Sequence, residues 1–122
     1  MARILIIDDD EQFRAMLAQM LEEDAHSVTV ACDGDEGLSL IAEAMPQLII
    51  TDILMPHKDG IETIAALSQA GSEIPIIAVS GGQRVTTADF NLALASLIGV
   101  KATLAKPFTR ADLRLALKQA LG

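Results

Sequence analysis

Carboxylate side chains follow two short apolar runs of the chain. The run Asp8–Asp10 comes directly after Ile4–Ile7, and Asp52 comes directly after Leu48–Thr51. If the two runs are neighbouring parallel strands, at least three carboxylates converge, and two charges about 4 Å apart repel by roughly 4 kcal/mol at an effective dielectric constant near 20. Such a cluster requires a cation, a shared proton or a function that offsets the repulsion. An oxygen-only ligand set that leaves room for water and phosphate favours Mg²⁺ over Ca²⁺.

The acidic residues divide into two groups. Asp10 and Glu11 are expected to cap the first helix, because acidic groups stabilise the positive end of the helix dipole. Asp8, Asp9 and Asp52 remain as the candidate metal site.

A hydroxyl and an ammonium group follow two further apolar runs. Ser80 comes after Ile74–Val79 and before two glycines, whose backbone N–H groups can approach an anion, although Ser-Gly-Gly is also an ordinary turn. Lys106 follows Ala102–Ala105 and precedes a proline. An ammonium aimed at the acidic crevice would neutralise phosphate charge as a point cation.

The elements that must position these residues alternate between short apolar runs and longer stretches of helical period. Ile4–Ile7, Leu48–Thr51 and Ile74–Val79 are typical of parallel strands buried on both faces, whereas Ser27–Ala31 and Ala102–Ala105 are typical of edge strands. Five β-α units predict an α/β fold, a doubly wound five-stranded parallel sheet of flavodoxin-like order 2-1-3-4-5 with helices on both faces. In that order the ends of the first and third strands are neighbours.

Each helical stretch is expected to bury one apolar face. The expected buried residues are Phe13, Leu17 and Met20 or Leu21; Leu38, Ile41 and Met45; Ile61, Ile64 and Ser68; and Leu113, Ala116, Leu117 and Ala120. Pro46, Gly71 and Gly99 are expected at helix ends. A further helix over Val85–Ile98 carries two apolar stripes; one of them either packs against the following helix or forms a surface that a partner or a second copy covers.

Length and charge limit the kinds of protein that the chain can be. Its 122 residues fit one domain, 1–122, and its formal charge of −8 argues against electrostatic binding to nucleic acid or to a membrane. No apolar run approaches the roughly 20 residues that span a bilayer, and the start of the chain does not resemble a signal peptide. We therefore expect a cytoplasmic protein.

The remaining residues whose side chains could bind a metal or react are expected to have structural roles. Cys32 is the single cysteine, which excludes an intramolecular disulfide, and it is expected to be a buried or half-buried small apolar residue. His26 precedes the expected second strand, far from the acidic residues, and is expected at the surface or in a cap. His57 is expected in an exposed loop, because Mg²⁺ prefers oxygen ligands. Phe13 and Phe108 are expected in the core.

Taken together, these segments resemble the receiver domain of bacterial response regulators. The resemblance rests on Ile-Leu-Ile-Ile-Asp8-Asp9-Asp10-Glu11, on Thr51-Asp52-Ile53-Leu54-Met55-Pro56 with Asp59-Gly60, on Ser80 after an apolar strand, and on Lys106-Pro107-Phe108. It covers essentially the whole chain, and the joint order and spacing make it specific.

The resemblance implies a role for each position. Asp52 would accept a phosphoryl group from a phosphohistidine of a histidine kinase or a phosphotransfer protein. Asp9 would bind Mg²⁺ directly, Asp8 would act mostly through a coordinated water, and the carbonyl group of Leu54 would complete the ligand set. Ser80 would bond a phosphoryl oxygen, and Lys106, before a cis peptide bond to Pro107, would pair with the phosphate.

Two departures from the family pattern bear on the output and the lifetime of the signal. Receivers commonly carry an aromatic residue three positions before the lysine, where this chain has Thr103. The residues two positions after Asp52 and two after Ser80, often polar in the family, are Leu54 and Gly82. Neither side chain can position a hydrolytic water.

We therefore expect a single-domain receiver, a signalling switch and not a turnover enzyme, that acts on a downstream protein target by direct contact and can form a homodimer. The alternative is a small haloacid-dehalogenase-like phosphatase, since Asp8-x-Asp10 after a first strand is the acidic pair that such enzymes use. That fold leaves Asp52 and Lys106 without a role. A third hypothesis is a protein-binding module on a receiver scaffold that is not phosphorylated.

Overall fold

The computed structural model of the chain describes residues 2–53, 60–80 and 100–122. Five parallel strands form one sheet in the order β2-β1-β3-β4-β5, which confirms the predicted fold class and strand order. The strands are β1 (Arg3–Ile7), β2 (Ser27–Ala31), β3 (Leu48–Asp52), β4 (Ile76–Ser80) and β5 (Ala102–Ala105). The helices of the described part are α1 (Glu11–Glu23), α2 (Gly34–Ala44), α3 (Gly60–Gln69) and α5 (Arg110–Leu121).

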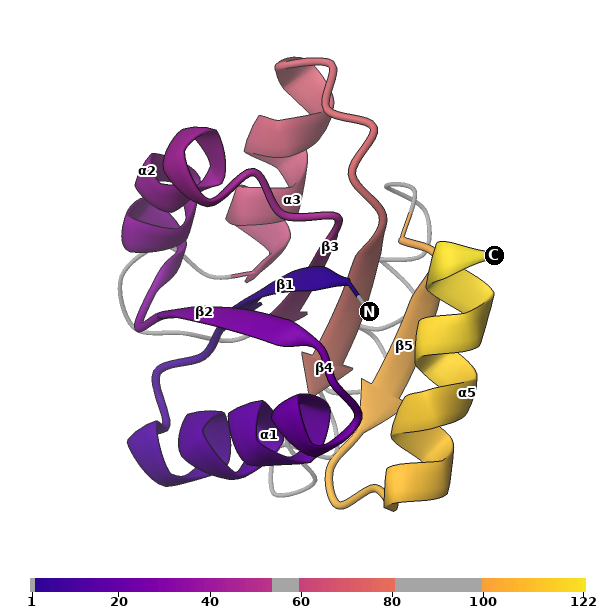
Figure 1. Cartoon of the computed structure of the whole chain (residues 1–122). Coiled ribbons are helices and arrows are strands. Elements are labelled where there is room, and N and C mark those ends of the chain that lie inside the picture. The colour runs from indigo at the N-terminus through magenta and orange to yellow at the C-terminus, as the bar shows by residue number, and fades with distance from the viewer. Residues whose placement is uncertain (1, 54–59, 81–99) are drawn as a thin grey trace.

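The sheet separates two hydrophobic cores (Figure 1). Successive side chains of a strand point to opposite faces, so Ile4 and Ile6 of β1 pack with α1 and α5, while Leu5 and Ile7 pack with α2 and α3. Because helices cover both faces, a central strand needs apolar residues at every position. This arrangement explains the continuous apolar runs of β1 and β3.

Polar side chains define the starts of the helices. Asp10 is the N-cap of α1, and its carboxylate accepts a hydrogen bond from Phe13 N at 3.1 Å. The prediction that Asp10 caps this helix is therefore confirmed, and Glu11 lies in the first turn. Thr109 caps α5 in a reciprocal capping box with Asp112.

Apart from Ile61, whose side chain lies outside what the structure describes, the expected buried faces are mostly correct, with two exceptions. In α2, Leu38 and Ile41 pack against the core, but Met45 is 66% exposed, because the helix ends there in a left-handed conformation with φ 47°. In α3, Ser68 is exposed and Leu67 is buried instead, because an apolar residue three positions after Ile64 lies on the same face of the helix. Met45 and Ser68 were thus wrongly expected in the core.

The loop after β2 corrects another expectation. Cys32 is exposed and not buried, because β2 ends at Ala31 and the next residue already belongs to the connection to α2. The backbone N–H of Cys32 donates to Glu36 Oε1 at 2.7 Å, and this bond holds the residue at the start of the helix.

Other expectations concern element ends. Strand β4 begins at Ile76, two residues later than expected. Gly71 follows α3 with φ 76°, a left-handed conformation that is common after a helix end. The expected helix over Val85–Ile98 and the helix end at Gly99 lie outside the described residues.

Hydrogen bonds at the start of β3 set its register against β1. Arg3 N donates to Gln47 Oε1 at 2.9 Å, and Gln47 N donates to Arg3 O at 2.7 Å. From there the strands pair residue by residue up to Ile7 opposite Thr51. Asp8, which follows β1, and Asp52, the last residue of β3, therefore lie at the same level of the sheet.

Ion pairs link the first and last helices. The Arg110 guanidinium pairs with Glu23, and Arg114 Nη2 lies 2.9 Å from Asp24 Oδ1. Nearby, His26 Nδ1 accepts a hydrogen bond from Ala2 N at 3.0 Å. Among the helices of the described ranges, none is long and apolar enough to cross a membrane.

Candidate functional site

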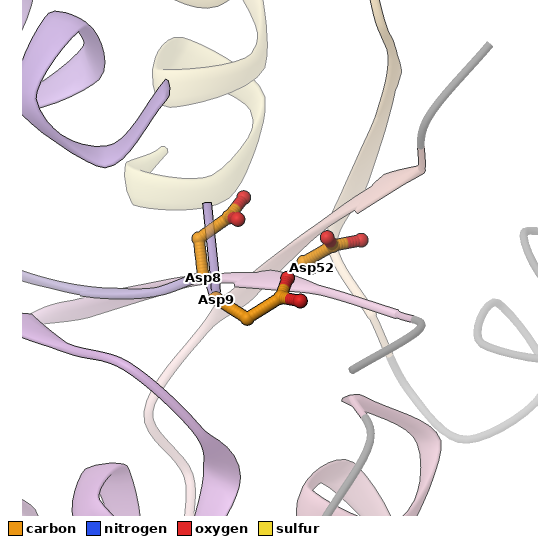
Figure 2. A group of neighbouring side chains, drawn as sticks. All are labelled: Asp8, Asp9 and Asp52. Atoms are coloured by element: carbon orange, nitrogen blue, oxygen red, sulfur yellow. The ribbon is translucent and has the colours of Figure 1, made fainter. Parts of the chain in front are cut away.

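Three carboxylates meet where β1 and β3 end. Asp8 is 1% exposed, Asp52 is 7% exposed and Asp9 is exposed, and one carboxylate oxygen from each lies within 4.8 Å of the others. In Figure 2, the side chain of Asp8 extends away from that of Asp9, and Asp52 lies beside them. The acidic cluster, Asp8, Asp9 and Asp52, therefore has a buried wall and an open side.

Hydrogen bonds hold Asp8 in one orientation. Its Oδ1 accepts from Asp10 N at 2.8 Å, and its Oδ2 accepts from Lys106 Nζ at 3.2 Å. Its backbone N–H donates to Ala31 O at 3.1 Å, which extends the pairing of β1 with β2 by one step. Both oxygens of this carboxylate are thus engaged by the protein.

The environment of Asp8 opposes its ionisation. Burial raises the pKa of the Asp8 carboxyl above its ordinary value, and this effect outweighs the opposing influence of the Asp10 N–H and the Lys106 ammonium. The neighbouring charge of Asp9 acts in the same direction as burial. A further cation at the cluster would favour the ionised form.

Lys106 brings a positive charge to the cluster from the opposite end of the chain. Its Nζ lies 3.2 Å from Asp8 Oδ2 and 3.8 Å from Asp52 Oδ2, and its side chain is only 19% exposed. The Lys106–Pro107 peptide bond is cis, as the family resemblance implied. The ammonium thus lies between the ends of β1 and β3.

Sequence reasoning missed two contacts of α1 with this site. The ring of Phe13 lies beneath the Lys106 ammonium, with Nζ 3.7 Å from the ring centroid. Arg14 Nη1 donates to the backbone carbonyl of Asp8 at 2.7 Å. The sequence indicated these contacts only weakly: Phe13 and Arg14 lie in the first turn of α1, after its N-cap Asp10, and therefore near the end of β1.

The other predicted site residues are described to different extents. Ser80 is the last residue of β4 and pairs in register with Ala105, the residue before Lys106, so its backbone is at the edge of the sheet where the cluster lies. Leu54, Gly82 and His57 lie outside the described residues. His26 is half-buried and distant from β1's carboxyl end, since it bonds to Ala2 at the opposite end of that strand.

Thr103 leaves space at the edge of the sheet. It is exposed on β5 and borders a hollow of about 340 Å³, which Leu104, Phe108 and Leu115 also line. Leu115 is 57% exposed. The hollow lies where an aromatic side chain at position 103 would have room.

The acidic cluster fits a small hard cation. Its donors are all carboxylate oxygens, which Mg²⁺ prefers, and two oxygens bound to one Mg²⁺ at 2.0–2.1 Å lie at most about 4.2 Å apart. The spacing within 4.8 Å requires only a small closure of the side chains. Asp9 is exposed on the open side of the cluster, whereas both oxygens of Asp8 already accept hydrogen bonds from the protein.

Comparison with known proteins identifies the family. Residues 4–118 match the response regulator receiver domain, and the chain belongs to this family. A receiver domain protein from Clostridium thermocellum superposes with a TM-score of 0.87 at 28% identity, covering 99% of this chain and 94% of that one. The chemotaxis protein CheY4 of Vibrio cholerae superposes with a TM-score of 0.85 at 28% identity and covers 99% of each chain.

Curated relatives extend beyond the receiver. The response regulator MprA of Mycolicibacterium vanbaalenii is 37% identical over 84 residues, which are 69% of this chain and 36% of that protein. The match thus spans about a third of the length of these relatives. The family match sets aside the phosphatase alternative, and Asp10, the second carboxylate which that alternative requires, instead caps α1.

Proposed function

We propose that the chain is the phosphoacceptor of a two-component phosphorelay and that Asp52 receives the phosphoryl group. The observation that carries this proposal is the position of the Lys106 ammonium, within 4 Å of both Asp8 and Asp52, beside a third carboxylate. A group that receives phosphate needs a nucleophilic oxygen, a metal-binding set and a separate cation in one crevice. The described residues offer all three.

The transfer requires little covalent chemistry from the protein. A carboxylate oxygen of Asp52 attacks phosphorus, a P–O bond forms, and the P–N bond to the donor histidine breaks. The leaving imidazole keeps the electron pair of that bond and takes up a proton. Positioning and charge stabilisation then do most of the catalysis, as in other phosphoryl transfers.

The chain's own residues would hold the metal and the phosphoryl group. Bound Mg²⁺ would supply positive charge to the transferring oxygens. Asp9 and Asp52 would bind it directly, Asp8 through a water, and the Leu54 carbonyl would complete the set. Lys106 would exchange its contact with Asp52 for one with a phosphoryl oxygen.

Output would follow from the bond between Ser80 and the phosphoryl group. Its formation would draw the segment after β4 toward the site and change a surface that a downstream protein or a second copy reads. Because position 103 is a threonine, the output would not involve a change of rotamer of an aromatic side chain there. The donor would be a histidine kinase or a phosphotransfer protein.

The direct test uses a small phosphodonor. Incubation with acetyl phosphate and Mg²⁺ should add one phosphoryl group by intact mass, and Asp52→Ala should remove it. Omission of Mg²⁺ should also prevent labelling. Full labelling of Asp52→Ala would refute the assignment, and steady turnover of a phosphomonoester would favour a phosphatase.

A further inference from the structure

The Lys106 ammonium is confined by an aromatic ring as well as by carboxylates. Its Nζ lies 3.7 Å from the centroid of Phe13, on α1. Phe108, two residues after Lys106, meets the same ring edge-on, with centroids 5.8 Å apart and planes at 86°. The loop after β5 therefore contacts the Phe13 ring of α1 at two points, through Lys106 and through Phe108.

Burial against the core favours an apolar residue at position 13, and the ring pair with Phe108 favours an aromatic one. Phe13 and Phe108 are half-buried and pack against the core shared by α1 and α5. A leucine offers no attraction to a cation, whereas the face of an aromatic ring carries negative electrostatic potential. The aromatic ring therefore attracts the ammonium group, whereas an aliphatic side chain would not.

The backbone of Phe13 is held independently of the lysine. Its N–H donates to the carboxylate of Asp10, the N-cap of α1, at 3.1 Å. The next residue, Arg14, donates to the backbone carbonyl of Asp8 at 2.7 Å. The ring is therefore fixed relative to the acidic cluster by the same short segment that follows β1.

We propose that Phe13 is a positioning residue for Lys106. Its ring holds the ammonium beside Asp8 and Asp52 before the phosphoryl group arrives. Because a ring face is broad, the contact persists while the ammonium moves from carboxylate to phosphoryl oxygen. This role rests on the proposed phosphorylation of Asp52.

The first test measures phosphorylation rates with acetyl phosphate at saturating Mg²⁺. Phe13→Leu should lower the rate by about three- to tenfold, the range expected for a lost cation–π contact, and Phe13→Tyr should retain the wild-type rate. Phe108→Leu is the matched control: it removes a ring from the same core and leaves the ammonium over Phe13, so its rate should stay near wild type. In a Lys106→Met background, Phe13→Leu should have no further effect.

Two results would overturn the inference. One is an equal rate loss from Phe13→Leu with and without the lysine, which indicates a packing role. The other is a wild-type rate in Phe13→Leu.

The second test does not depend on phosphorylation. Protons above a ring face resonate upfield, so the ε-methylene signal of Lys106, assigned with Lys106→Met, should lie upfield of the other three lysines. In Phe13→Leu, the chemical shift of the Lys106 ε-methylene protons should move to that of the other lysines. In Phe108→Leu, it should remain upfield. A wild-type signal among the other lysines would refute the contact. The two proposals can fail separately. If the Lys106 signal lies upfield but Asp52 cannot be phosphorylated, the contact is real, whereas the proposed function and the role of Phe13 in it are wrong.

Discussion

Lys106 Nζ lies 3.2 Å from Asp8 Oδ2, so the residue that follows β5 forms an ion pair with the residue that follows β1, 98 positions earlier in the chain. The lysine therefore offsets part of the repulsion within the acidic cluster. It also closes the site on the side of α1.

Replacing the lysine should separate metal binding from phosphoryl transfer. In Lys106→Met, we expect Mg²⁺ affinity to stay within about fivefold of wild type or to rise, because a like charge near the metal is removed. Phosphorylation should slow, and any phosphorylated protein should lack the conformational change. Titration calorimetry and hydrogen exchange measure the two effects. Loss of Mg²⁺ binding in a protein that still unfolds cooperatively would contradict the assigned role.

The three carboxylates should contribute unequally to metal binding. Mg²⁺ at 100 times its dissociation constant stabilises a protein by about 2.7 kcal/mol. Asp9→Asn should abolish this shift in thermal unfolding, while Asp8→Asn should keep part of it, because Asp8 accepts hydrogen bonds from Asp10 and Lys106 instead. An equal loss in both variants would show that Asp8 is also a direct ligand.

A helix contact behind the site should be sensitive to one methyl group. A Cβ atom at Gly37 of α2 would lie 2.9 Å from Cγ1 of the fully buried Ile7 and closer still to its Cδ1. We expect Gly37→Ala to lower the free energy of unfolding by about 1–2 kcal/mol, since overpacking costs about 1–3 and the better helix propensity of alanine recovers at most about 1. Combining it with Ile7→Val should restore part of the loss beyond additivity, measured by urea unfolding. Additive effects would show that the two positions do not clash.

His26 should make the stability fall in mild acid. Burial lowers the pKa of His26 below its ordinary value of 6.5, so the unfolded chain takes up the proton first. The stabilisation is present above pH 6.5 and is lost as the pH falls from there through the folded pKa. Protonation also removes the acceptor of the hydrogen bond from Ala2 N. Thermal unfolding between pH 7.5 and 5.5 should show this loss, and the loss should be smaller in His26→Gln; an identical slope in both proteins would exclude His26.

The phosphorylated state should be long-lived. Leu54 and Gly82 have no hydrogen-bonding side chain to hold an in-line water, so Leu54→Asn or Gly82→Glu should accelerate the loss of phosphate. Phos-tag electrophoresis over time measures the decay. If neither substitution speeds it, water positioning does not limit hydrolysis in this protein.

The strand order and the position of Asp52 were predictable because both depend on local pattern. An apolar run such as Leu48–Thr51 identifies a central strand, and the parallel arrangement brings the residue after it to the same edge as Asp8. The ring of Phe13 beneath Lys106 was not predictable in this way. It depends on the direction of two side chains brought together only by the tertiary fold.

The incorrect expectations have local causes. Met45 has the helical period of its neighbours, but the helix ends at that residue in a left-handed conformation. The residue type of Cys32 predicts burial, but the side chain is exposed because β2 ends one residue earlier. Exact element ends depend on capping geometry, which residue type alone does not determine.

The bonds between Arg3 and Gln47 lie at the edge of the sheet opposite the acidic cluster, yet they define where Asp52 stands. All five residues of β3 are buried, so its hydrophobicity alone would tolerate a slip of one position. The bonds of Gln47 therefore fix the register from which the position of Asp52 follows. One residue gained or lost within β3 would turn the Asp52 carboxylate to the other face of the sheet. Length variation in this family of sequences should thus be tolerated before Gln47 and excluded between Gln47 and Asp52.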